Sequence, residues 1–257
     1  MSTRSRVLVA IAAVAALAVI VVAVMLVLSP RLMLPGDSGA APPEPPGPDH
    51  ALPAAAPPLA EARTRAGVAG LADADWVERV SAASGIPARA LAAYAGAAIV
   101  KARAMPSCGL GWTTLAAIGL IESDHGRHGG SSVGEDGTVT PPIFGIALDG
   151  AATAHIADSD GGAIDGDAEY DRAVGPMQLI PQTWRNWHVD GSGDGVEDPQ
   201  NIDDAVVATS NYLCRASGDM AGREGWRAGV GAYNSSDAYV QSVADAANRY
   251  AKDASGD

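Results

Sequence analysis

Residues 112–123 read WTTLAAIGLIES, and this stretch decides the fold. Apolar side chains fall all around the helix that it would form, so we expect most of its circumference to be buried. Glu122 is the exception. A carboxyl group at the end of an apolar helix loses hydration when it ionises, which raises its pKa and suits it to act as a general acid. An exposed acid near a helix end is the alternative interpretation.

Further helices are expected on both sides of this stretch. Asp75 can cap one helix, Gly85 can end it, and Pro87 can open the next. Helical patterns cover residues 76–83, 87–104, 112–123, 181–187, 203–216, 226–233 and 236–250. Strands and helices do not alternate, so the predicted fold class is mainly α.

Residues 126–168 are rich in Gly and Asp and lack helical periodicity. They predict a long irregular loop insertion with one short strand at 143–147. Long loops inside compact domains usually carry function.

Residues 7–28, VLVAIAAVAALAVIVVAVMLVL, contain neither charge nor proline. As a helix they would reach about 33 Å, enough to cross the hydrocarbon core. Arg4 and Arg6 precede them, so the positive-inside rule predicts a cytoplasmic tail at 1–6 and an extracellular catalytic domain. A cleaved signal peptide is the alternative, but its apolar core is usually about 7 to 15 residues long. The length favours a retained single-pass anchor in the cytoplasmic membrane.

Residues 29–58 are too rich in Pro, Ala and Gly to bury a core, and we interpret them as a semi-extended linker. The folded domain would then span 59–257. Cys108 and Cys214 are the only cysteines. Outside the membrane such a pair most simply forms a disulfide, although two buried thiols are the alternative.

The formal net charge is −13, from 30 acidic and 17 basic residues. A nucleic-acid surface needs clustered Lys and Arg, so the composition argues against a nucleic-acid partner.

Three motifs follow one another along the domain. They are E-S-x-x-G at 122–126, G-P-M-Q-x-x-P-x-T-W at 175–184, and A-Y-N at 232–234. In this order they resemble the lytic transglycosylases with a lysozyme-like fold, most closely the membrane-bound lytic transglycosylase B type of actinobacteria. The resemblance covers roughly residues 75 to 250, and the second motif is the most specific.

The resemblance implies an enzyme that acts on peptidoglycan glycan strands. It would cleave the β-1,4 bond between N-acetylmuramic acid and N-acetylglucosamine and leave a 1,6-anhydro end. Glu122 would be the single acid/base, and no cofactor would be required for the chemistry. The residues implied to contact the substrate are Ser123, Met177, Gln178, Tyr233 and Asn234.

One carboxyl group suffices for this reaction, because it can protonate the leaving oxygen and then accept the proton of the C6 hydroxyl. Hydrolases of the same bond need a second carboxylate, and Glu135, Glu169 and Asp171 are the candidates. Glu169 stands where the resembling enzymes have serine, so it is either a solvent-facing loop acid or a substrate-binding residue that contributes to oxocarbenium stabilisation. A muramidase and a non-catalytic wall-binding protein are the alternative functions.

A second pattern, DGSGDGV at 190–196, follows the central motif. Asp190, Ser192 and Asp194 stand at positions 1, 3 and 5 of a calcium loop, and Val196 could offer its carbonyl oxygen. The expected glutamate at position 12 is missing, and the resemblance supplies Asp204 instead. The pattern predicts a structural calcium ion, and the alternative is a turn that binds nothing.

Two other patterns in the sequence do not predict a metal site. His125 and His128 form His-x-x-His without a third ligand, so we expect surface polar residues rather than a zinc site. The stretch from Asp158 to Asp167 has glycine at position 5, and we interpret it as a solvated acidic loop.

Overall fold

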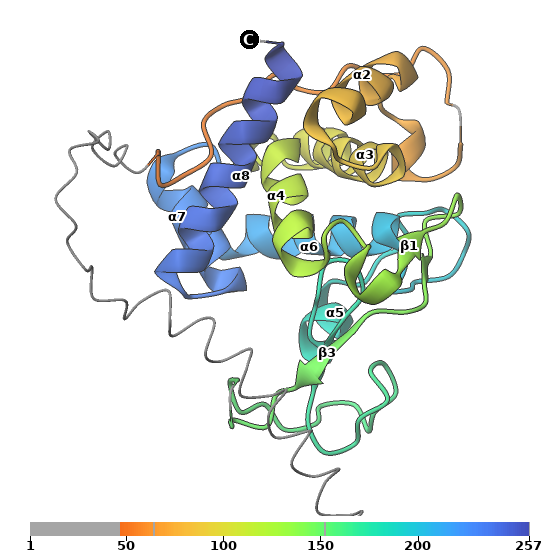
Figure 1. Ribbon diagram of the computed structural model, residues 1–257, viewed down its shortest axis with the longest axis vertical. Helices are drawn as coiled ribbons and strands as arrows, with labels where there is room; N and C mark the ends of the chain where they lie inside the picture. The colour runs from red at the N-terminus through yellow and green to blue at the C-terminus, as the bar shows by residue number, and fades with distance from the viewer. Residues whose placement is uncertain (1–46, 64, 152, 257) are drawn as a thin grey trace, which may run out of the picture. The chain divides into compact units, whose positions relative to one another are not determined.

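The computed structural model describes residues 47–63, 65–151 and 153–256 (Figure 1). The predicted cytoplasmic tail, membrane helix and first part of the linker lie outside these residues. Within them, no single helix is long and apolar enough to cross a membrane, and α2 (Ala74–Ser84) and α3 (Ala88–Ala104) pass that test only as a pair bent by 120°.

The described residues are mainly helical, as predicted. The α-helices are α2 (Ala74–Ser84), α3 (Ala88–Ala104), α4 (Trp112–Ser123), α5 (Pro181–Trp187), α6 (Ile202–Ser217), α7 (Arg223–Tyr233) and α8 (Asp237–Ser255). Short 3-10 helices lie at η1 (Val68–Gly70), η2 (Pro106–Cys108) and η3 (His128–Gly130). Most helix ends fall within two residues of the predicted ones, because proline, glycine and capping side chains are local signals.

The cap of α2 differs from the prediction. Asp73, not Asp75, accepts the N–H of Trp76, at 2.9 Å, and Asp75 lies in the first turn. There its negative charge still favours the positive end of the helix dipole.

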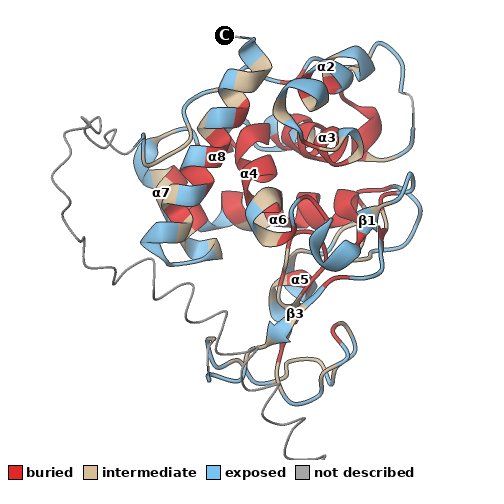
Figure 2. Cartoon of the chain, viewed as in Figure 1, coloured by how far each residue is buried: buried red, intermediate tan, exposed pale blue. Residues whose placement is uncertain are grey.

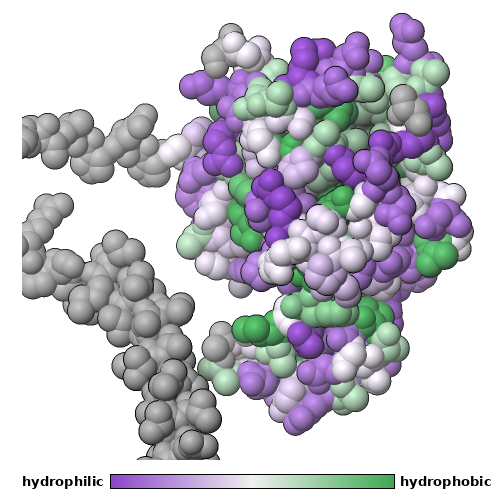
Figure 3. Space-filling model, turned by 45° about the vertical axis from the view of Figure 1, so that its right-hand side comes forward, coloured by the Kyte–Doolittle hydropathy of each residue, from purple (hydrophilic) through white to green (hydrophobic). Residues whose placement is uncertain are grey.

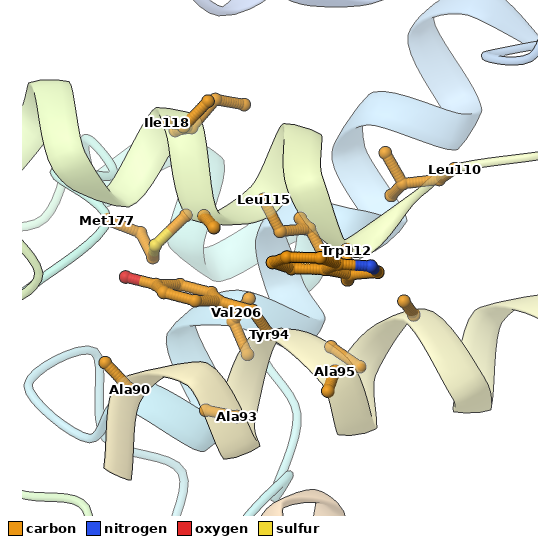
Figure 4. Packing of buried hydrophobic residues seen from close by; sticks show 14 of the residues in the cluster. Ala90, Ala93, Tyr94, Ala95, Leu110, Trp112, Leu115, Ile118, Met177 and Val206 are labelled. Atoms are coloured by element: carbon orange, nitrogen blue, oxygen red, sulfur yellow. The ribbon is translucent and has the colours of Figure 1, made fainter. Parts of the chain in front are cut away.

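Helix α4 lies at the centre of the core (Figures 1 and 2). It packs against α3, α6 and α8. Trp112, Leu115 and Ile118 on α4 are almost fully buried, and Tyr94 of α3 lies beside them (Figure 4). The indole Nε1 of Trp226 on α7 donates to Thr114 Oγ1 at 3.0 Å. The prediction that most of this helix is buried is confirmed.

Two small antiparallel sheets carry the long insertion. Strand β1 (Ser132–Val133) pairs with β2 (Val139–Thr140), and β3 (Phe144–Ala147) pairs with β4 (Arg172–Val174). Strand β3 coincides with the predicted strand. The irregular chain between β3 and β4 forms a lobe below the helices in Figure 1, and Figure 3 shows hydrophobic residues exposed where this lobe meets the helical body.

Cys108 and Cys214 form a disulfide that joins η2 to α6, which confirms the predicted pairing. Residues 47–58 belong to the predicted linker, and residues 49–52 among them lie against α7 and α8, while Ala55 O accepts the indole N–H of Trp112 on α4 at 3.2 Å. Leu52 N donates to Asn248 Oδ1 at 2.8 Å, and Asn248 Nδ2 donates to the carbonyl of His50 at 3.0 Å. Asp49 pairs with Arg223 and Arg227. We call residues 47–58 the N-terminal strap.

Candidate active site

A cleft of about 620 Å³ lies where α4, α6 and α7 meet the chain before α5 and one wall of the insertion. This volume is typical of sites for small ligands. The cleft is lined by Glu122, Leu148, Thr153, Ala154, Ile156, Ala173, Gln178, Leu179, Ile180, Thr183, Tyr212, Gly231, Ala232, Tyr233, Asn234 and Ser235. Glu122, Gln178, Tyr233 and Asn234, which the sequence predicted from three separate motifs, are thus brought together.

Glu122 lies in the last turn of α4 and is partly buried. Burial raises its pKa to about 7, and a hydrogen bond from Tyr239 opposes the shift. Tyr239 Oη donates to Glu122 Oε1 at 2.6 Å from the first turn of α8. A carboxyl group with this pKa holds its proton in much of the population near neutral pH, as a general acid must.

Tyr239 was missing from the predicted site. It lies within the helix predicted at 236–250, and none of the three motifs includes it. Its contact with Glu122 joins residues 117 positions apart, so no local pattern signals it. Burial and the nearby Glu122 both raise the pKa of Tyr239, so its hydroxyl stays protonated as a donor.

The turn after α4, directly behind Glu122, is held by hydrogen bonds. Asp124 and His125 both have positive φ, 51° and 59°, and their N–H groups donate to Leu120 and Gly119. Ser123 Oγ donates to the carbonyl of Pro176 at 2.6 Å. Ser123 was predicted to contact the substrate, but it is buried and absent from the cleft lining. Its hydrogen bond instead joins the first motif to the second.

The first two motifs each contain a glycine at a position where another residue would not fit. A Cβ on Gly126 would lie 2.7 Å from Val133 Cγ2, and Gly126 has a φ of +81°. A Cβ on Gly175, whose φ is +74°, would lie 1.8 Å from the carbonyl oxygen of Pro199. Only glycine accepts both the backbone conformation and the close approach.

The second motif divides between cleft and core. Gln178 lines the cleft, has a φ of 47°, and donates from Nε2 to Gly175 O at 2.9 Å. Met177 was predicted to contact the substrate, but it is absent from the cleft lining. Its side chain is fully buried beside Tyr94 (Figure 4). The backbone carbonyl of Met177 accepts the hydroxyl of Tyr233.

Aromatic residues form the far side of the cleft. Tyr233 closes α7, and Tyr212 on α6 packs against it with ring centroids 5.9 Å apart. Tyr212 Oη donates to Ala232 O at 2.6 Å. Tyr212 is a second residue of the cleft lining that the sequence motifs do not include.

None of the three predicted companion acids lines the cleft. Glu135 pairs with Arg65, and Glu169 is exposed on the insertion. Asp171 is fully buried and accepts the N–H and the hydroxyl of Ser159, at 2.8 and 2.9 Å. Among the described residues, Glu122 is therefore the only carboxyl group in the cleft lining.

The predicted calcium loop is held by hydrogen bonds. Backbone N–H groups donate to the carboxyl groups of Asp190 and Asp204, which lie close together. The donors are Gly193, Asp194 and Gly195 for Asp190, and Gly191, Ser192 and Asp198 for Asp204. Asp194 accepts from the N–H of Val196.

In the described part of the chain, no three His, Cys, Asp or Glu side chains are grouped to hold a metal ion. A carboxylate oxygen that accepts an N–H group keeps a further lone pair for a cation, so these hydrogen bonds do not decide the site, and the calcium ion at this loop stays a prediction.

The two histidines of the His-x-x-His pattern, His125 and His128, differ from each other. His128 is exposed, as expected, but His125 is 1% exposed, so its assignment to the surface was wrong. The positive φ of His125 turns its ring into the protein, where two tyrosine hydroxyls accompany it.

Comparison with known proteins gives one match. The family model described as a transglycosylase SLT domain matches residues 157–231, which include the second motif but neither Glu122 nor Asn234. No curated protein and no solved structure gives a match. The match and the mainly helical fold together support a peptidoglycan lytic transglycosylase family with a lysozyme-like fold.

Proposed function

We propose that this protein is a lytic transglycosylase that cleaves the β-1,4 bond between N-acetylmuramic acid and N-acetylglucosamine, with Glu122 as the single acid/base. The observation that carries the proposal is the position of Glu122 as the only carboxyl group among the described residues that line the cleft. A hydrolase of the usual kind needs a second carboxylate at the same bond.

The reaction needs two proton transfers at one group. Glu122 gives its proton to the glycosidic oxygen as the bond to C1 breaks, and the positive charge spreads over the sugar ring. The C6 hydroxyl oxygen then bonds to C1, and its proton returns to the Glu122 carboxylate. Tyr239 would stabilise that carboxylate through its hydrogen bond while the anhydro ring closes.

Mass spectrometry of the released muropeptides tests the proposal. The full chain, solubilised in detergent, is incubated with purified peptidoglycan in water enriched in ¹⁸O. We expect products that lack one water relative to the reducing sugar and carry no ¹⁸O. Glu122→Gln should release nothing above background, and the exposed acid variant Glu61→Gln should match the wild type.

Two outcomes would contradict the proposal. Reducing ends that contain ¹⁸O would identify a muramidase. Undetectable release by both wild type and Glu122→Gln, together with sedimentation on peptidoglycan, would identify a wall-binding protein.

We further propose that residues 7–28 anchor the enzyme in the cytoplasmic membrane with the catalytic domain outside. The support is the uninterrupted apolar run and the two arginines before it. Deletion of residues 7–28 should move the protein from the membrane fraction to the soluble fraction. Alkaline extraction of the wild type from membranes would contradict the anchor.

A further inference from the structure

A buried polar cluster lies behind the cleft. His125 Nδ1 lies 3.2 Å from Tyr94 Oη, and His125 Nε2 lies 3.0 Å from Tyr250 Oη. The three side chains are at most 2% exposed. They come from α3, from the turn after α4, and from α8, so the imidazole bridges two helices through the end of a third.

The cluster is built for a neutral imidazole. One ring nitrogen can donate to one hydroxyl while the other accepts from the second hydroxyl. Burial lowers the pKa of His125 to about 4, and the nearby Arg127 and Arg249 act in the same direction against Asp124. At neutral pH both ring nitrogens are therefore engaged without a buried charge.

The packing around the cluster is close. The backbone N–H of His125 donates to Gly119 O, within α4. A Cβ on Gly119 would lie only 2.0 Å from Tyr94 Oη, so glycine at this position lets the tyrosine cross α4 to reach the imidazole. No sequence pattern had indicated this role for Gly119 or for Tyr94.

The cluster and Glu122 share two elements. His125 lies three residues after Glu122, in the turn that follows α4. Tyr250 and Tyr239 lie on α8 about three helical turns apart. The end of α4 is thus tied to α8 at two points, once by Glu122 to Tyr239 and once by His125 to Tyr250.

We propose that His125 is a positioning residue for Glu122, because its bridge between Tyr94 and Tyr250 holds the end of α4 against α8 and so keeps the Glu122 carboxyl desolvated beside Tyr239. The role in catalysis rests on the proposed function, whereas the role in placing the carboxyl group does not.

The test measures the Glu122 carboxyl directly. The full chain in detergent is labelled with ¹³C at the glutamate side-chain carboxyl, and Glu122→Gln assigns its NMR signal. In His125→Leu we expect the pKa of Glu122 to fall by about one unit or more from its raised value, because water enters when α4 loosens. His125→Gln, which keeps a donor and an acceptor, should restore most of the shift. His128→Leu, at the exposed histidine, is the matched control and should titrate like the wild type.

Activity gives the second readout. In His125→Leu we expect kcat to fall by roughly 10- to 100-fold with little change in KM, as for a misplaced catalytic group. His125→Gln should recover most of that loss.

An unchanged Glu122 titration and an unchanged kcat in His125→Leu, with only a lower Tm, would overturn the proposal in favour of a purely structural role. If His125→Leu does not fold, Tyr250→Phe decides by the same criteria, because it removes a single hydroxyl. A wild type that forms no anhydro product would refute the proposed function, while the NMR titration would still test the positioning role.

Discussion

At the scale of single residues, Glu122 is subject to two opposing influences. Burial at the end of α4 raises its pKa to about 7, and the hydrogen bond from Tyr239 restrains the shift. A carboxyl group whose pKa is raised in the folded protein stabilises the fold less as the pH rises through that value. The property that suits Glu122 to catalysis therefore lowers stability.

Glu122→Gln should accordingly stabilise the protein in a pH-dependent way. Above pH 7 the folded wild type carries a partly buried charge that the variant lacks, and the expected gain is on the order of 3 kcal/mol. The gain should decline between pH 7 and 4.5 and vanish below, where both folded and unfolded wild type hold the proton. Chemical denaturation across pH 4 to 8 measures it, and a gain that does not vary with pH would contradict the raised pKa.

Tyr239→Phe tests the hydrogen bond itself. Loss of a bond to a charged group costs about 1.5 to 3 kcal/mol, so kcat should fall by roughly 10- to 100-fold. The Glu122 pKa should rise further, because the influence that lowers it is gone, and the alkaline limb of the activity profile should move to higher pH. The control Tyr170→Phe alters a tyrosine outside the cleft lining. Equal profiles for Tyr239→Phe and the wild type would exclude this role.

At the scale of the elements, local signals and tertiary contacts can be separated. The helix ends follow from Asp73, Gly85 and similar caps, which act within a few residues. Which side chains line the cleft and which pack in the core does not follow from such local signals. Met177 and Gln178 are neighbours in one motif, yet one packs beside Tyr94 and the other lines the cleft.

The loop at 190–196 provides an element-scale prediction. Its carboxyl groups accept backbone N–H groups, so the loop is closed by hydrogen bonds. Because the sequence predicts a calcium ion at this loop, we expect Tm to be higher in excess calcium than in chelator, with magnesium as the control. Equal Tm values in calcium and in chelator would contradict the predicted calcium site.

At the scale of the whole molecule, the disulfide closes a long loop. Cys108 and Cys214 are 106 residues apart, and the chain between them contains α4, the insertion and α5. Replacement of both cysteines by alanine should lower the free energy of unfolding by about 3 to 5 kcal/mol, because the unfolded chain regains its freedom. Denaturant titration measures the loss, reduced wild type is the control, and a loss below about 1 kcal/mol would contradict this account.

The N-terminal strap provides the second prediction at this scale. The hydrogen bond and charge of Arg223 lower the pKa of Asp49 to about 2, with further help from Arg227. The stabilisation from Asp49 should therefore be present above pH 4 and be lost between pH 4 and 2. Asp49→Asn should lower Tm at pH 7, less so in high salt, and much less at pH 2 than at pH 7. Glu61→Gln is the exposed control, and equal Tm values at pH 7 would show that the strap does not depend on this contact.

The sequence by itself determined the mainly α class, the helices, the disulfide and the three motifs that meet in the cleft. These features rest on periodicity, caps and residue types, which are readable within short windows. Only the tertiary structure decided that Tyr239 bonds Glu122, that His125 is buried, that Ser123 and Met177 face the interior, and that the companion acids stay outside the cleft lining. Each of these depends on side chains from distant helices or on a left-handed turn, and burial, which sets the Glu122 pKa, exists only once those helices have packed together.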